Sequence, residues 1–416
     1  MNKQTSSIFN IAVLVAALGY FVDIYDLLLF QIVRIDSLKD LGVTGDKIDS
    51  DGQFIISIQM LGLLLGGIIW GIMGDKKGRL SVLFGSIVLY SVSNIINGFV
   101  HTTNQYALIR FFAGVGLAGE LGAGITLVSE LVIKEKRGLS TSLVAGIGLT
   151  GAVVAYFISE KFHWRTCYFI GGGLGFCLLI LRISVFESGM YNEVKKQNVS
   201  RGNIFMFFNN RKRFRKYVLA ILIGLPTWYV IGMLIAFSNK FGNAFGFTED
   251  VLPKKSTMFA YVAISVADLL IGFVSHWLRS RKKALYLFYV FTIIAIAFFF
   301  NQYNGTAAGM YVICAAMGFG TGFWAIFVTM AAEQFGTNLR ATAATTIPNM
   351  VRGSLPLMLA LFSGLQSLLK HTLQQSSSQA YINAAIITGV IIMAISITAV
   401  YFTEETFGKD LDYTET

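Results

Sequence analysis

Ionisable side chains occur inside stretches of this sequence that are otherwise apolar. Asp23 and Asp26 stand within GYFVDIYDLLLF, and Arg110, Glu120 and Arg352 lie in comparable stretches. A charge at the middle of a bilayer costs about 2.5 to 3.5 kcal/mol on insertion scales, so such residues usually face a bundle interior and pair with one another. A carboxylate held there can alternate between an ionised, arginine-paired form and a protonated form, which is the chemistry of proton coupling.

The composition places these residues in a membrane. The chain has 416 residues, of which 55% are hydrophobic and only 13% charged, whereas a soluble domain has about 25% charged residues. Twelve apolar stretches have the length of about 20 residues that crosses ~30 Å of hydrocarbon as a helix. We therefore predict an all-α integral membrane protein with twelve transmembrane helices, at 9–32, 54–74, 80–100, 105–131, 139–159, 166–187, 217–239, 256–278, 284–301, 306–333, 341–365 and 380–402.

The formal net charge of +10 reflects membrane topology. With the N-terminus in the cytoplasm, most of the 33 lysines and arginines fall in the inside loops, as the positive-inside rule requires. This distribution predicts a multi-pass protein of a bacterial-type inner membrane with both termini cytoplasmic, and it argues against a nucleic-acid partner. Anionic membrane lipids are the expected partners of the basic loops. The first span is too long for a signal peptide and is predicted to be retained.

The spans divide into two similar halves. Residues 1–187 and 217–416 each contain six spans, and the basic segment 188–216 is predicted to be a cytoplasmic linker. In span four Glu130 precedes Arg137 by seven residues, and in span ten Glu333 precedes Arg340 by the same spacing. Internal duplication of this kind is typical of transporters whose substrate site lies between the repeats.

The loop GIMGDKKGRL, residues 71–80, carries a recognisable pattern. Gly71 allows close helix approach, Gly78 permits a tight turn, and Asp75 stands beside the basic residues Lys76 and Arg79. In this order the residues resemble the signature loop of the major facilitator superfamily. The second-half copy, DLLIGFVSHWLRSRKK, keeps Asp268 and the basic run but lacks the Asp and Gly of the turn.

Further motifs resemble the sugar porter, metabolite:proton symporter and organic-ion branches of that family. They are RFFAGVGLAGELGAG from Arg110, the HWR at 163–165, and the pairs Glu187-Ser188 and Glu405-Thr406 that close the two halves. The resemblance covers the whole chain and implies the major facilitator fold, two pseudo-symmetric six-helix halves. It is specific for the family and weak for the substrate.

The resemblance implies a partner for one of the aspartates. In the sugar porter branch the aspartate of a Tyr-Asp in helix one pairs with the arginine that begins the helix-four motif, and Tyr25, Asp26 and Arg110 match those positions. Asp26, with Asp23 three residues earlier on the same helix face, is therefore expected to couple protons to the conformational change. A permanent structural ion pair and direct binding of substrate by the carboxylate are the alternatives.

Charged residues also gather where helices are expected to emerge on the cytoplasmic side. Ion pairs there could hold the inner side closed in one state and separate in the other, and a pair worth about 1 kcal/mol is enough to bias a balanced equilibrium. Orientation of the loops during insertion is the alternative role. The predicted cytoplasmic gate comprises Gly71, Asp75, Lys76, Gly78, Arg79, Glu130 and Arg137 of the first half, with Asp268, Arg281, Glu333 and Arg340 of the second.

A substrate cavity is predicted from polar and aromatic residues at mid-span. In IPNMVRGSLP two prolines loosen the helix around Asn349 and Arg352, and Arg352 either receives an anionic substrate group or pairs with a carboxylate across the cavity. Glu120 could face the same cavity or a neighbouring helix. Trp228, Tyr229 and Trp324 are candidates for stacking on substrate, although aromatic residues in spans more often serve packing.

The sequence contains no pattern for enzymatic or ATP-driven chemistry. It has no phosphate-binding loop and no nucleophile-base constellation, and its cysteines and histidines lack metal-ligand spacing, so no cofactor or metal is expected. We predict a monomeric secondary transporter that moves a small polar metabolite, with an organic anion favoured by Arg110 and Arg352, in symport with protons or with sodium. A proton-coupled exporter and a non-transporting nutrient sensor are the rival interpretations.

Overall fold

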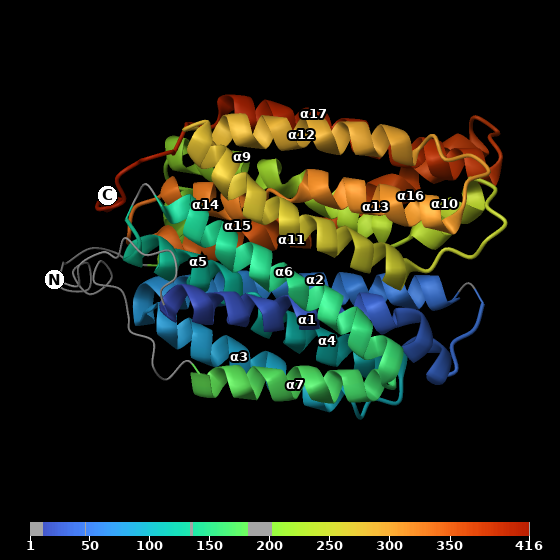
Figure 1. The fold of residues 1–416 in the computed structure, drawn as a ribbon, viewed down its shortest axis with the longest axis horizontal. Coiled ribbons are helices and arrows are strands. Elements are labelled where there is room, and N and C mark those ends of the chain that lie inside the picture. Colours follow the sequence, from blue (N-terminus) through green and yellow to red (C-terminus); the bar gives the residue numbers. More distant parts are fainter. Residues whose placement is uncertain (1–10, 46, 134–135, 182–201, 416) are drawn as a thin grey trace.

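The computed structural model describes residues 11–45, 47–133, 136–181 and 202–415, and every regular element within them is a helix. In these described ranges, eleven helical segments are long and apolar enough to cross a membrane, so the protein is a multi-pass membrane protein. The long helices run side by side along one direction (Figure 1). The first half contains α1 (Ile11–Asp40), α2 (Lys47–Lys77), α3 (Arg79–Asn97), α4 (Thr103–Leu117), α5 (Glu120–Leu131), α6 (Arg137–Lys161) and α7 (Trp164–Leu181).

The second half repeats this pattern with more interruptions. Its helices are α9 (Arg211–Tyr229), α10 (Ser238–Ala244), α11 (Pro253–Trp277), α12 (Arg281–Phe299), α13 (Ala307–Thr321), α14 (Trp324–Glu333), α15 (Arg340–Gly353), α16 (Leu355–His371) and α17 (Ser377–Phe402). The predicted span 341–365 consists of α15 and α16, which meet at Ser354. Pro356 causes this interruption because it has no N–H to donate to the carbonyl of Arg352, four residues earlier.

Spans four and ten are interrupted at corresponding places. Span four consists of α4 and α5, separated by Ala118 and Gly119, and span ten consists of α13 and α14, separated by Gly322 and Phe323. Gly119 packs so closely that a Cβ there would lie 2.9 Å from atoms of Ser86 and Val82. The internal repeat predicted from the sequence therefore extends to the position of the helix breaks.

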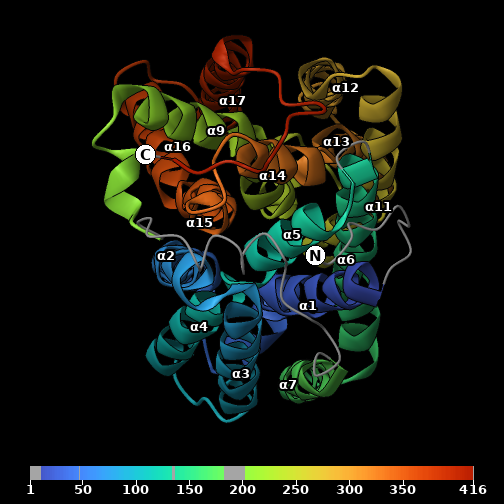
Figure 2. The same cartoon turned by 90° about the vertical axis from the view of Figure 1, so that its left-hand side faces the viewer.

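The two halves pack against each other along glycine-lined helix faces. Viewed along the helices, α1 to α7 form one group and α9 to α17 the other, with α2 against α15 and α6 against α11 (Figure 2). A Cβ at Gly67 of α2 would lie 2.8 Å from Cβ of Asn349, and one at Gly71 would lie 3.1 Å from Cα of Thr342. Gly67 and Gly71 of span two therefore approach α15 of the other half.

Close helix approach within the first half yields a stability prediction. A Cβ at Gly62 of α2 would overlap the carbonyl oxygen of Phe111 in α4, whereas one at Gly173 of α7 would meet nothing within 4 Å. We expect Gly62→Ala to lower the stability by about 1 to 3 kcal/mol, as overpacking does. The matched Gly173→Ala should leave it unchanged or slightly raised, since alanine favours helix. Thermal unfolding in detergent compares the two, and equal midpoints would contradict the α2–α4 packing.

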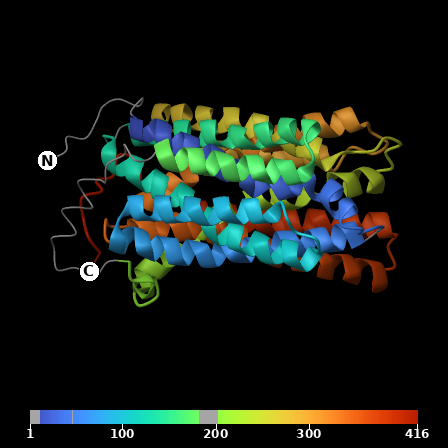
Figure 3. The same cartoon turned by 90° about the horizontal axis from the view of Figure 1, so that it is seen from below.

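One end of the molecule carries the C-terminal tail, residues 403–415, and we call it the tail end. α1 begins at this end and the tail lies across it (Figure 3). The helix α9 begins here at Arg211, inside the segment 188–216 that was predicted to be a linker. The difference arises because the Asn210 side chain caps the helix, accepting hydrogen bonds from the backbone N–H groups of Lys212 (2.9 Å) and Arg213 (3.2 Å).

Candidate functional site

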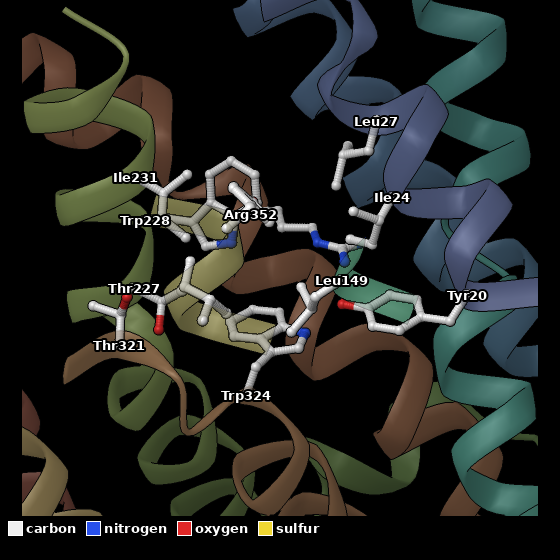
Figure 4. Close-up of a pocket in the computed structure, with 12 residues that line it drawn as sticks. Tyr20, Ile24, Leu27, Leu149, Thr227, Trp228, Ile231, Thr321, Trp324 and Arg352 are labelled. Carbon is white, nitrogen blue, oxygen red and sulfur yellow. The ribbon is translucent and has the colours of Figure 1, made fainter. Parts of the chain in front are cut away.

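A cavity lies between the two halves near the middle of the bundle. It has about 310 Å³ of empty volume, and both halves contribute to its wall. The first half supplies Tyr20, Ile24 and Leu27 of α1 with Leu149 of α6. The second half supplies most of the aromatic and polar groups, which include Trp228, Tyr261, Trp324, Thr227 and Arg352 (Figure 4).

The Arg352 guanidinium is the charged group of this cavity. The Arg352 residue is 2% exposed, and its side chain reaches from α15 past the tryptophans toward Tyr20 (Figure 4). Its Nη1 donates a hydrogen bond of 3.3 Å to Oδ1 of Asn349, and its guanidinium carbon lies 5.6 Å from the centre of the Trp324 ring. Within the described residues it forms no ion pair, and its Nε has no hydrogen-bond partner.

Asparagine 349 is held in place by the helix break of the first half. Its Nδ2 donates to the carbonyl oxygens of Ala118 (2.8 Å) and Thr345 (2.8 Å), which leaves its Oδ1 for Arg352. Ala118 belongs to the first half and Asn349 to the second. The orientation of Arg352 therefore depends on the contact between the halves.

Asp26 and Arg110 form a buried ion pair entirely within the first half. Nη1 of Arg110 lies 3.1 Å from Oδ1 of Asp26, and its Nη2 donates to the Asp26 carbonyl at 2.9 Å. Gln59 and Asn94 accept further hydrogen bonds of 3.3 Å from the same guanidinium, and both members of the pair are fully buried. The pair links α1, α2, α3 and α4 and lies outside the wall of the central cavity.

Three other predicted residues, Asp23, Glu120 and Tyr229, do not line the cavity. Asp23 is fully buried in α1, on the same helix face as Tyr20 of the cavity wall. Glu120 begins α5 and is 2% exposed. Tyr229 points toward α17, where its hydroxyl donates to the carbonyl of Ala385 at 2.8 Å, so it is not placed to stack on a ligand in the cavity.

At the tail end, charged residues of the first half contact the start of α15. Arg340 and Glu130 form an ion pair of 3.1 Å across the two halves, and both are fully buried. Asp75 accepts hydrogen bonds from the backbone N–H groups of Ala341 (3.1 Å) and Thr342 (2.8 Å) and from the Thr342 hydroxyl (2.7 Å). Asp75 therefore caps a helix of the opposite half, an arrangement that the signature loop alone does not reveal.

The remaining predicted gate residues at this end contact one half or the tail. Arg281 pairs with Glu333 at 3.0 Å inside the second half, and Arg137 donates to the carbonyl of Lys409 in the tail at 3.2 Å. Gly78 has φ +104°, as the tight turn between α2 and α3 requires. Lys76 is exposed, and the side chain of Arg79, like the Glu187-Ser188 pair, lies outside the described residues.

Asp268 does not belong to the tail-end network, contrary to the prediction. It lies nine residues, about 14 Å, before the end of α11 and is fully buried. Its Oδ1 accepts a hydrogen bond of 3.0 Å from the backbone N–H of Ala325, so it caps α14 at the break in span ten. The prediction was wrong because the degenerate second-half motif retains the aspartate while the turn that would place it at the helix end has been lost.

At the end opposite the tail, ion pairs also connect the two halves, and these contacts were not predicted from the sequence. Arg34 lies beyond the predicted span 9–32, but it is 1% exposed within α1, where it lies 3.7 Å from Asp49 and donates to the Ala236 carbonyl at 3.4 Å. Lys240 also pairs with Asp49 at 3.2 Å, and Lys254 pairs with Glu160 at 2.7 Å. The two halves are thus in contact at both ends of the central cavity.

Comparison with known proteins shows which family this chain resembles. A family model described as Major Facilitator Superfamily matches residues 7–360. A putative niacin/nicotinamide transporter NiaP of Bacillus subtilis is 26% identical over 347 residues, covering 80% of this chain and 82% of that protein. The niacin transporter NiaP of Acinetobacter baylyi is 24% identical over 433 residues, covering 96% and 94%. The solved proton:xylose symporter XylE, at 16% identity, superimposes with a TM-score of 0.76 over 99% of this chain and 98% of that one.

Proposed function

The chain belongs to the major facilitator superfamily of membrane transporters, and on that premise we propose that it imports a small aromatic carboxylate together with a proton. The observation that carries the proposal is the Arg352 guanidinium, which is buried, directed into the central cavity and without an ion-pair partner among the described residues. Rocking of the two halves about this cavity would expose it to one side of the membrane at a time.

A substrate carboxylate would complete the surroundings of Arg352. Arginine stays protonated in proteins, and a buried charge without a counter-ion is costly. A carboxylate can accept two parallel N–H bonds from a guanidinium, which supplies both the missing charge and the missing acceptors. Arg110, the other cation of the original organic-anion prediction, is already committed to Asp26. The preference for an anion therefore depends on Arg352.

The remaining residues of the cavity wall favour a substrate that contains an aromatic ring. Four aromatic side chains, Tyr20, Trp228, Tyr261 and Trp324, line the central cavity. Such rings bind another ring through stacked or edge-to-face contacts. Niacin, which appears in the names of two relatives of this chain, one of them a putative niacin/nicotinamide transporter, is a pyridine ring that carries one carboxylate. This chemistry matches one arginine among aromatic walls.

Proton coupling is assigned to Asp26, with Arg110 as its counter-ion. Protonation of Asp26 would release the Arg110 ion pair that ties α1 to α4, and α1 also supplies Ile24 and Leu27 to the cavity wall. The coupling would act through the position of α1, because Asp26 does not line the cavity. The Glu130–Arg340 pair and the Asp75 cap would serve as the gate at the tail end, which the positive-inside rule places in the cytoplasm.

Uptake by right-side-out membrane vesicles tests the proposed direction and substrate class. With an imposed inward proton gradient, we expect the vesicles to accumulate labelled nicotinate or benzoate, but not nicotinamide or benzamide, which lack the charge. An exporter would fail to accumulate them, and a sensor would bind them without any flux. Accumulation of the neutral amides to the same level would contradict the role of Arg352.

Substitution of the arginine gives the corresponding binding prediction. We expect Arg352→Gln to weaken nicotinate or benzoate binding by about 30-fold or more, because loss of one partner of a buried charge pair costs at least about 2 kcal/mol. Ligand-induced thermal stabilisation of the purified protein measures this change. Lys370→Gln, which removes an exposed charge from the adjoining helix α16, is the control and should bind like the unaltered protein.

A further inference from the structure

A second pocket opens at the tail end, outside the proposed transport path. It has about 750 Å³ of empty volume and lies between the first turns of α9 and the C-terminal tail. The side of α9 contributes Lys212, Arg213 and Lys216, and the tail contributes Lys409, Tyr413 and Glu415. The pocket therefore joins a membrane helix of the second half to the segment that covers the tail-end gate.

The charges around this pocket do not balance. Arg213 lies 3.7 Å from Glu415, and Lys216 lies 3.2 Å from Glu404. In the part of the chain that the structure describes, Lys212 and Lys409 form no ion pair, and the pocket lining contains four cations and one carboxylate, Glu415. Glu404 and Glu333 attract Lys409 from outside the lining. Lys212 and Lys216 are also four residues apart on one helix, a spacing at which like charges destabilise the helix.

Lys409 is affected most directly by this excess of positive charge. Burial, followed by the nearby charge of Lys216, lowers the pKa of Lys409 below its ordinary value. Its Nζ lies 5.4 Å from the centre of the Tyr413 ring, which provides a weaker attraction than an anion would. An anion in the pocket would provide the counter-ion that Lys212 and Lys409 lack among the described residues.

The tail is already fixed to the gate by hydrogen bonds on both halves. Arg137 of the first half donates to the Lys409 carbonyl, and Arg340 of the second donates to the Leu411 carbonyl. The Thr337 backbone N–H donates to the Tyr413 carbonyl at 2.8 Å, and Asn338 exchanges two hydrogen bonds with Glu415. Separation of the halves would break the hydrogen bond from Arg137 to the Lys409 carbonyl, because Arg340, Thr337 and Asn338 hold the tail on the second half.

We propose that this pocket binds a phosphate-bearing dianion, which holds the C-terminal tail across the tail-end gate and slows transport. Phosphate suits the site because it offers several acceptor oxygens and a charge near −2, whereas a single carboxylate would leave part of the excess unmatched. A soluble phosphorylated metabolite and an anionic lipid headgroup share this chemistry. The predicted slowing of transport rests on the proposed function, whereas the predicted binding of phosphate in this pocket does not.

Binding is tested with inorganic phosphate on the purified full-length protein. We expect phosphate to raise the thermal midpoint more than sodium chloride at equal ionic strength. The double variant Lys212→Gln/Lys409→Gln should weaken the phosphate effect by about tenfold or more. Lys77→Gln/Lys283→Gln, which removes two exposed charges at the same end outside the pocket, should respond like the unaltered protein. The proposed phosphate site would be contradicted if phosphate raised the thermal midpoint equally in both double variants. It would also be contradicted if sodium chloride raised the midpoint as much as phosphate.

The immobilisation of the C-terminal tail and the source of the phosphate are tested separately. Phosphate should slow hydrogen exchange of the tail amides and of Thr337. Unchanged exchange would show that phosphate does not immobilise the tail, even if phosphate binds in the pocket. In proteoliposomes of neutral lipid, slower nicotinate uptake with added phosphate would identify a soluble ligand. Slower uptake only with phosphatidic acid in the bilayer would identify a lipid. If no substrate is transported, the proposed function fails, whereas the thermal and exchange measurements still decide this inference.

Discussion

Asp26→Asn is expected to abolish proton-driven accumulation while leaving exchange of substrate across the membrane. Asparagine has nearly the size of aspartate but cannot gain or lose a proton, so a proton gradient can no longer be coupled to movement of α1. The Arg110 guanidinium keeps three acceptors, namely Gln59, Asn94 and the backbone carbonyl of residue 26. The variant should therefore fold. Accumulation driven by an inward proton gradient and counterflow at equal pH are the two measurements.

The control for this variant is a carboxylate on the same helix that is exposed. Asp36 lies ten residues further along α1, its side chain is 59% exposed, and it is 3.8 Å from Lys254. Asp36→Asn should retain accumulation, because an exposed pair of this kind contributes little. If Asp26→Asn still accumulates substrate against a gradient, Asp26 is not the coupling site. Loss of both accumulation and counterflow would instead indicate a general defect in transport.

Glu130→Gln is expected to shift the protein toward opening at the tail end. Removing one partner of a buried ion pair costs about 3 to 5 kcal/mol, because the other charge is left uncompensated. Arg340 can recover hydration only when the halves separate, so the substitution destabilises the closed state. The equilibrium between the closed and open states at the tail end therefore changes by more than about 100-fold. A cysteine at Thr141, whose hydroxyl lies 2.8 Å from that of Thr329 across the halves, reports the opening through its reaction with a thiol reagent.

Glu333→Gln provides a matched comparison for this prediction. The Arg281–Glu333 pair is as short and nearly as buried as Arg340–Glu130, but it lies within the second half. Its loss should lower thermal stability without the large increase in cysteine labelling. Equal labelling in the two variants would show that the position of the Glu130–Arg340 pair between the halves has no special effect. The natural cysteines, of which Cys177 is exposed, must first be replaced.

The motifs predicted contacts well where two matching residues lie in one half. The pairing of Asp26 with Arg110 follows from a family pattern and is present in the structure. The same approach failed for Asp268, because a degenerate motif kept the residue but not the turn around it. It also missed Arg34, which lies outside the predicted span 9–32 because the apolar run ends before it. Its burial arises from α1 continuing to Asp40 and from contact with the second half.

The sequence by itself determined the membrane class, the order of the spans, the division into similar halves and the residues that resemble the family. These features follow from hydropathy, charge distribution and spacing along the chain, which act locally and leave a one-dimensional pattern. The tertiary structure alone decided that Arg352 has no ion-pair partner among the described residues, and that Asp75 caps a helix of the other half. It also placed the tail over the gate. The physical reason is that ion pairing and capping depend on distances of a few ångströms between helices, which are set by how glycine-lined faces pack.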